Sequence, residues 1–155
     1  MIQALPPPRD ARGQVIDLEP ISGLLDLISR AWHPKAVRLF GSRAKGLAKP
    51  ESDWDLFVVV PDDEPAADDL MAVYELRRRS GGAADLILCR VSDFEDARDV
   101  PNTLAYEAAH FGVPIRPRSH RPPRPGTYFG VTTQIDIGPV AASVSASKSC
   151  AYAQT

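Results

Sequence analysis

The hydrophobic residues between positions 20 and 61 recur first at helical and then at extended spacing. Apolar residues three or four positions apart predict a helix that begins near Pro20 and ends at His33-Pro34. These residues are Ile21, Leu24, Leu25, Ile28 and Trp32. The runs "AVRLF" (36–40) and "DLFVVV" (55–60) are typical of short strands, the second of them buried, and Pro61 stops it.

Helical and extended patterns continue to alternate as far as Arg116. Apolar spacing predicts a helix over 69–79, whose C-terminal arginines 77–79 match the helix dipole. The segments that follow are a strand "ADLILC" (84–89), a helix capping box "SDFE" (92–95), a helix from near Pro101 to Gly112 and a short strand "VPI" (113–115). Strands that alternate with helices predict one α/β domain over residues 18–116.

The two ends of the chain differ from this pattern. Residues 1–17 are aperiodic and contain proline and arginine, so we expect a loose arm. Residues 117–155 are rich first in proline and arginine and then in alanine and serine, which predicts a mostly disordered tail with at most a transient strand near 128–137. The basic stretch 116–125 fits a solvated linker, with an RNA- or partner-binding tail as the alternative.

Composition and charge restrict the classes of function. The 155 residues are 44% hydrophobic, which suits one globular domain with its own core. A net charge of -2 does not favour a general phosphate-backbone surface, so direct binding of nucleic acid is not expected. The start lacks a secretory pattern, and no apolar run approaches the roughly 18 residues of a membrane helix. We therefore expect a cytoplasmic protein with no membrane partner.

Two aspartates lie at the start of a strand that is otherwise apolar. In an extended chain Asp53 and Asp55 face the same way, about 6.6 to 7 Å apart, while Trp54 points to the opposite face. Their charges repel by about 2 to 3 kcal/mol at an effective dielectric constant near 20. A divalent cation between them would reverse the sign of that energy. Magnesium, which favours one or two carboxylates together with substrate phosphates, fits such a site.

Two further elements fit the same chemistry. Gly41-Ser42 allows a tight turn whose amides can face an anion, with Arg43 and Lys45 adding positive charge. An ordinary turn with a serine cap is the alternative. Asp85 is an isolated charge at the start of the third strand, where a third carboxylate can bind a catalytic metal and help to deprotonate a hydroxyl. A solvent-exposed charge at the strand end is the alternative there.

The segment "GSRAKGLAKPESDWDLFVVV" (41–60) resembles the signature of the minimal nucleotidyltransferases of the DNA polymerase beta-like superfamily. In that family a Gly-Ser loop precedes an Asp-x-Asp strand by about ten residues. The likeness is strongest over 36–60, and the third strand and the closing "EAAHFGVPI" (107–115) are similar in order and length. It implies the nucleotidyltransferase fold, a small mixed sheet flanked by helices. Trp54 departs from the usual aliphatic residue, and we expect it to pack on the back of the sheet.

The resemblance also implies a role for each residue of the motif. Gly41 and Ser42 would hold the triphosphate of a nucleotide, and Asp53 and Asp55 would bind two Mg²⁺ ions. Asp85 would bind the catalytic metal and orient or deprotonate the acceptor hydroxyl. The charges of Arg43 and Lys45 would neutralise phosphate.

For the whole protein, the resemblance implies transfer of a nucleoside monophosphate, AMP from ATP, to an acceptor hydroxyl. The minimal family often modifies a partner protein, a HEPN ribonuclease toxin that its antitoxin adenylylates on tyrosine, and this is the function we expect. One alternative is an antitoxin without catalysis that acts by occlusion. Another is a small-molecule, antibiotic-type nucleotidyltransferase whose acceptor site is shared across a homodimer. The sequence leaves the nucleotide, the acceptor and a homo-oligomer open.

Overall fold

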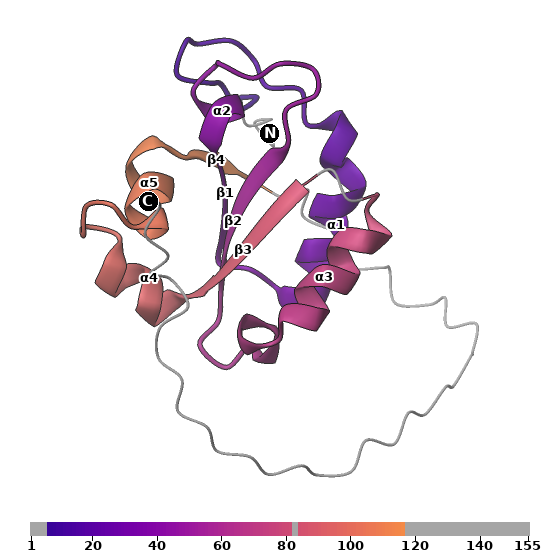
Figure 1. Ribbon diagram of the computed structural model, residues 1–155, viewed down its shortest axis with the longest axis vertical. Coiled ribbons are helices and arrows are strands. Elements are labelled where there is room, and N and C mark those ends of the chain that lie inside the picture. Colours follow the sequence, from indigo (N-terminus) through magenta and orange to yellow (C-terminus); the bar gives the residue numbers. More distant parts are fainter. Residues whose placement is uncertain (1–5, 82–83, 117–155) are drawn as a thin grey trace, which may run out of the picture.

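The computed structural model describes residues 6–81 and 84–116. Its centre is a four-stranded mixed sheet with helices on both faces (Figure 1). The strands are β1 (Ala36–Phe40), β2 (Trp54–Val60), β3 (Ala84–Arg90) and β4 (Val113–Ile115), in the order β3-β2-β1-β4. The helices are α1 (Ser22–Trp32), α2 (Gly41–Ala44), α3 (Leu70–Arg79), α4 (Val91–Ala97) and α5 (Leu104–Phe111), with 3₁₀ turns η1 (Glu19–Ile21) and η2 (Pro65–Asp68). The α/β class and the small mixed sheet are confirmed. The tail expected over 117–155 lies outside the described residues.

The register of the sheet brings distant parts of the sequence side by side. Strand β1 is antiparallel to β2 and to β4, while β2 and β3 run parallel. A parallel pair needs a crossover, which α3 provides between β2 and β3. The start of β2 therefore lies beside the start of β3 and beside the end of β1, where the chain turns into α2 (Figure 1).

The side chains of β2 alternate between two hydrophobic cores. Leu56 and Val58 belong to the core beneath α1 and α3, whereas Phe57 and Val59 belong to the core beneath α4 and α5 (Figure 1). Trp54, only 5% exposed, packs in the first of these cores. The prediction that Trp54 packs on the face opposite to Asp55 is therefore confirmed.

Two helices begin differently from the sequence prediction. The prediction of a capping box over 92–95 is wrong. Helix α4 begins at Val91 without a side-chain cap, and the Ser92 amide donates instead to Asp62 Oδ1 at 2.9 Å. Helix α5 begins at Leu104 and not near Pro101, because the Thr103 side chain accepts the Tyr106 amide at 3.0 Å and caps the helix there.

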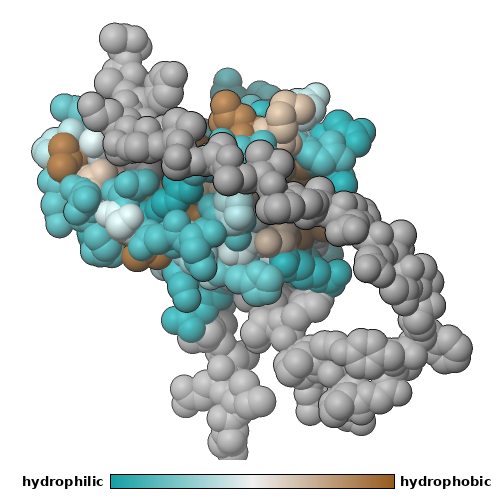
Figure 2. All heavy atoms as spheres, turned by 90° about the horizontal axis from the view of Figure 1, so that it is seen from below, coloured by the Kyte–Doolittle hydropathy of each residue, from teal (hydrophilic) through white to brown (hydrophobic). Residues whose placement is uncertain are grey.

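Helix α3 leaves three of its apolar residues exposed, Leu70, Met71 and Tyr74. Asp69 caps it, and of its residues Leu76 is buried, while Leu70 and Tyr74 are 85% and 57% exposed. Figure 2 shows hydrophobic residues in small separate patches among hydrophilic ones on the face that it presents. In the described part of the chain, no helix combines the length and apolar character needed to cross a membrane.

Part of the arm expected over 1–17 is ordered in the structure. The Asp10 carboxylate accepts the amides of Arg12 and Gln14, both at 2.9 Å, so the chain turns back on itself. The amide of Ala11 donates to the carbonyl of Ala44 at 2.8 Å. These contacts place the turn against α2, beside the end of β1.

Candidate functional site

Three aspartates gather where β2 and β3 begin. Asp55 and Asp85 are partners in the parallel register of these strands, so their side chains lie on the same face, that of α4 and α5. Asp53 precedes Asp55 by two residues. Burial raises the pKa of Asp55 above its ordinary value of 3.8, and the charges of Asp85 and then Asp53 raise it further, while Arg43 lowers it. The structure thus brings together the three carboxylates that the sequence singled out.

Gly41 lies directly against one of these carboxylates. A Cβ at this position would overlap Asp55 Oδ2 and lie 2.9 Å from Asp55 Cγ, and Gly41 also has a positive φ of 69°. Both facts require glycine, because a side chain would displace the carboxylate and strain the backbone. The glycine therefore places the backbone at the start of α2 next to Asp55.

Ser42 follows at the second position of α2. The helix is preceded by Phe40 in the cap position and has no side-chain cap, so the alternative of a serine cap at this turn is wrong. Within residues 6–81 and 84–116, the Ser42 hydroxyl is not bonded to any other group. Its hydroxyl is thus available to a ligand beside Gly41.

Arg43 is held by the loop that leads to Asp53. Its Nη2 donates to the Ser52 carbonyl at 2.5 Å, and its guanidinium carbon lies 4.1 Å from the centre of the Trp54 ring. These contacts fix the loop between α2 and β2, and the charge still lowers the pKa of Asp55. The structure therefore gives Arg43 a positioning contact that the sequence did not predict.

Lys45 pairs with a residue of helix α5. Its Nζ forms an ion pair of 2.5 Å with Glu107 Oε1 on α5. Lys45, Glu107, Gly41 and Thr103 are among the residues that line a cavity of about 450 Å³. This volume falls in the range of small-molecule sites. A polar cavity thus adjoins the turn that carries Gly41.

Arg77 is the residue of this site that the sequence analysis missed. Its Nη2 lies 2.9 Å from Asp85 Oδ1, although α3 covers the other face of the sheet. The sequence explained Arg77 together with Arg78 and Arg79 as charges at a helix end. Nothing in that run distinguishes the arginine that reaches Asp85, because the contact depends on how α3 sits over β3.

The three carboxylates are of the right chemical type to bind a divalent cation, but their present arrangement does not form a binding site for one. Carboxylate oxygens are the ligands that magnesium prefers. A cation would relieve the repulsion from Asp85 and Asp53, which adds to burial in raising the pKa of Asp55. Yet among residues 6–81 and 84–116 no group of three or more His, Cys, Asp or Glu side chains is arranged to hold a metal ion. Asp85 is directed to Arg77 instead. The chemistry of the residues fits a metal, and the carboxylates would have to turn to converge on it.

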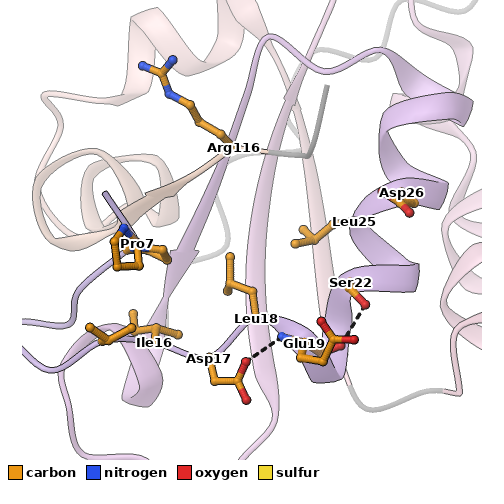
Figure 3. Close-up of a pocket in the computed structure, with 11 residues that line it drawn as sticks. Pro7, Ile16, Asp17, Leu18, Glu19, Ser22, Leu25, Asp26 and Arg116 are labelled. Carbon is orange, nitrogen blue, oxygen red and sulfur yellow. Dashed lines mark hydrogen bonds between the residues drawn. The ribbon is translucent and has the colours of Figure 1, made fainter. Parts of the chain in front are cut away.

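A second cavity, of about 490 Å³, lies elsewhere in the molecule. Figure 3 shows it between the N-terminal segment, the start of α1 and Arg116, with the apolar side chains of Ile16, Leu18 and Leu25 among those that line it. Neither Gly41 nor any of the three aspartates lines it. This cavity is therefore separate from the aspartate site.

Comparison with known proteins gives one match. The family described as nucleotidyltransferase domain matches residues 21–100, just over half of the chain. The matched region runs from the start of α1 past the end of α4 and contains the three aspartates and the turn at Gly41. No curated protein matches the chain, and no solved structure matches it.

Proposed function

The chain belongs to the nucleotidyltransferase domain family, and from this premise we propose that it transfers AMP from ATP to an acceptor hydroxyl. The observation that carries the proposal is the pairing of Asp55 with Asp85 in register, with Gly41 packed against the Asp55 carboxylate. This arrangement puts carboxylates and the amides of a helix start at one place. A nucleoside triphosphate with its metal ions requires that combination.

In the proposed reaction the acceptor oxygen bonds to the α-phosphorus of ATP, and the bond from that phosphorus to the bridging β-phosphate oxygen breaks. Pyrophosphate leaves with the bonding electrons. Asp85, whose side chain is 49% exposed, would bind the catalytic metal and take the hydroxyl proton. Asp53 and Asp55 would hold two Mg²⁺ ions, which when bound stabilise the attacking and leaving oxygens.

The triphosphate would lie over the turn at the start of α2. The amides of Gly41 and Ser42 belong to the first turn of that helix, and the Ser42 hydroxyl has no partner in the described residues. Lys45, on the wall of the adjoining cavity, would add positive charge once its pairing with Glu107 opens. The cavity beside Gly41 offers room for another part of the nucleotide.

For the acceptor we propose a tyrosine of a partner HEPN ribonuclease toxin, which would make the protein an antitoxin. Its support is the resemblance of residues 36–60 to the minimal nucleotidyltransferases, in which such partners are common. One observation favours a second candidate, an antitoxin that neutralises its toxin by occlusion alone. Asp85 is ion-paired with Arg77, and the carboxylates of the described residues are not assembled around a metal position.

One experiment separates the two candidates. The purified chain is incubated with ATP, Mg²⁺ and a HEPN protein encoded by a neighbouring gene, and the mass and ribonuclease activity of that protein are measured. We expect the mass of one AMP to be added and activity to be lost. Asp85→Asn should retain binding of the partner and slow transfer by roughly 10² or more. If Asp85→Asn neutralises the toxin as well as the parent and neither adds a nucleotide, the protein acts by occlusion.

A further inference from the structure

The three arginines at the end of α3 do not all have the same partner. Arg78 and Arg79 both contact Glu75 on their own helix, with Nε to carboxylate distances of 3.0 and 3.1 Å. The Arg77 side chain instead extends away from the helix, and its Nη2 lies 2.9 Å from Asp85 Oδ1. Only Arg77 of the three therefore joins the helix to the carboxylate site on β3.

The path of this contact is set by the topology. Strand β3 is at one end of the sheet, so no further strand separates its edge from solvent in the described part of the chain. Leu76 packs in the core under α3, while Asp85 shares the opposite face with Asp55. Arg77 therefore reaches from the α3 side of the sheet to a carboxylate on the opposite face. The proposed reaction assigns that carboxylate to the metal and to the hydroxyl proton.

We infer that Arg77 is a positioning residue that holds Asp85 in the nucleotide-free protein and competes with a divalent cation for it. This inference rests on the proposed function. The carboxylate oxygen that accepts the guanidinium cannot at the same time be fully available to a metal ion. Both side chains are partly exposed, 41% for Arg77 and 49% for Asp85, so water weakens the ion pair and a cation can displace it.

The strength of such a half-exposed pair sets the size of the expected effect. Replacing Arg77 by glutamine removes the competing charge, and the affinity for Mn²⁺ in the absence of nucleotide should rise about two- to fivefold. Arg77→Lys keeps a cation within reach of Asp85 and should bind Mn²⁺ like the parent. Arg79→Gln removes the same charge from the same helix end without touching Asp85, and it should also bind like the parent.

The experiment measures free Mn²⁺ by electron paramagnetic resonance during titration of the full chain and of these variants. Each variant is also made in a chain that carries Asp85→Asn, and in that background Arg77→Gln should no longer change the affinity for Mn²⁺. Circular dichroism checks that every variant is folded. Equal tightening in Arg77→Gln and Arg79→Gln would show a general charge effect and overturn the inference, as would unchanged or weaker binding in Arg77→Gln.

Failure of the inference can be told apart from failure of the proposed function. If the parent binds Mn²⁺ together with ATP and Arg77→Gln behaves like the parent in every titration, the role of Arg77 is wrong and the nucleotidyl transfer proposal stands. If the parent binds no Mn²⁺ with or without ATP, both are wrong.

Discussion

Gly41 and Asp55 lie so close together that no side chain fits between them: a Cβ on residue 41 would overlap Asp55 Oδ2. The approach joins the end of β1 to the start of β2, because Phe40 and Asp55 are partners in the antiparallel register. The backbone amides that open α2 and the carboxylates of the site are thus fixed relative to each other by main-chain pairing.

Gly41→Ala should therefore damage both stability and binding. The new Cβ must displace the Asp55 carboxylate, and the positive φ adds about 1 to 2 kcal/mol of strain. We expect a lower Tm and a lower affinity for ATP with Mg²⁺, measured by thermal unfolding and calorimetry.

Two other glycines separate the causes of that damage. Gly81 has a φ of 92°, and no atom of residues 6–81 and 84–116 lies near the place its Cβ would take, so Gly81→Ala should lower the Tm without changing ATP affinity. Gly23 lies in α1, where an added Cβ would meet no neighbouring group in the described part of the chain, and Gly23→Ala should raise stability by about 0.5 to 1 kcal/mol. Loss of ATP affinity in Gly81→Ala would mean that strain, and not contact with Asp55, explains Gly41.

Asp55→Asn should stabilise the protein in the absence of metal. The pKa of Asp55 is raised by burial and by Asp85 and Asp53, so its ionised form disfavours the folded state at neutral pH. In EDTA at pH 7 the variant should have the higher Tm. The advantage should shrink as pH falls through the raised pKa and vanish below 3.8, the value for the unfolded chain. Addition of Mg²⁺ should raise the Tm of the parent and not that of the variant.

Asp68→Asn should have the opposite sign. Arg90 Nη1 and Nη2 contact the two Asp68 oxygens at 2.8 and 2.5 Å, and these bonds lower the pKa of Asp68. The stability they contribute is present above pH 3.8 and is lost as pH falls through the lowered pKa. The variant should thus have a lower Tm than the parent at pH 7, and the difference should disappear in acid. A higher Tm at pH 7 would contradict the assignment.

The local pattern of the sequence predicted the elements and half of the site. Alternation along one strand is enough to put Asp53 and Asp55 together and Trp54 behind them, and a glycine before a helix start marks a close approach. These inferences need only neighbouring residues. Asp85 stands out as an isolated charge at the start of an apolar strand, and the nucleotidyltransferase resemblance implies its role. Its partnership with Asp55 depends on parallel pairing across a crossover, which local pattern does not predict.

What the sequence failed to predict depends on contacts between distant segments. Ser92 looks like a helix cap, but its amide is taken by Asp62, which is 30 residues away in the sequence. Arg77 is one of three adjacent arginines, and only the placement of α3 on β3 selects it. The N-terminal arm shows no periodicity, yet Asp10 folds it by accepting amides within its own turn. The spacing of hydrophobic residues does not predict such polar contacts.

Arg43 and Lys45 should differ in what their removal changes, although the nucleotidyltransferase resemblance implies the same role for both. Arg43 is bonded to the Ser52 carbonyl and stacked on Trp54, whereas the Lys45 side chain is 47% exposed and paired with Glu107. Arg43→Met should cost about 1 to 3 kcal/mol of stability, because a charged hydrogen bond and a cation–π contact are lost.

Lys45→Met should change the free energy of unfolding by no more than about 1 kcal/mol, since its ion pair is partly exposed. If Lys45 meets a phosphate, the same variant should bind ATP with Mg²⁺ roughly tenfold more weakly. Glu107→Gln tests the cavity wall: it frees Lys45 without removing its charge, so ATP should bind at least as tightly as to the parent. Calorimetry and thermal unfolding on the three variants decide the assignment. If Arg43→Met has an unchanged Tm and binds ATP more weakly, then Arg43, and not Lys45, is the residue that contacts the phosphates.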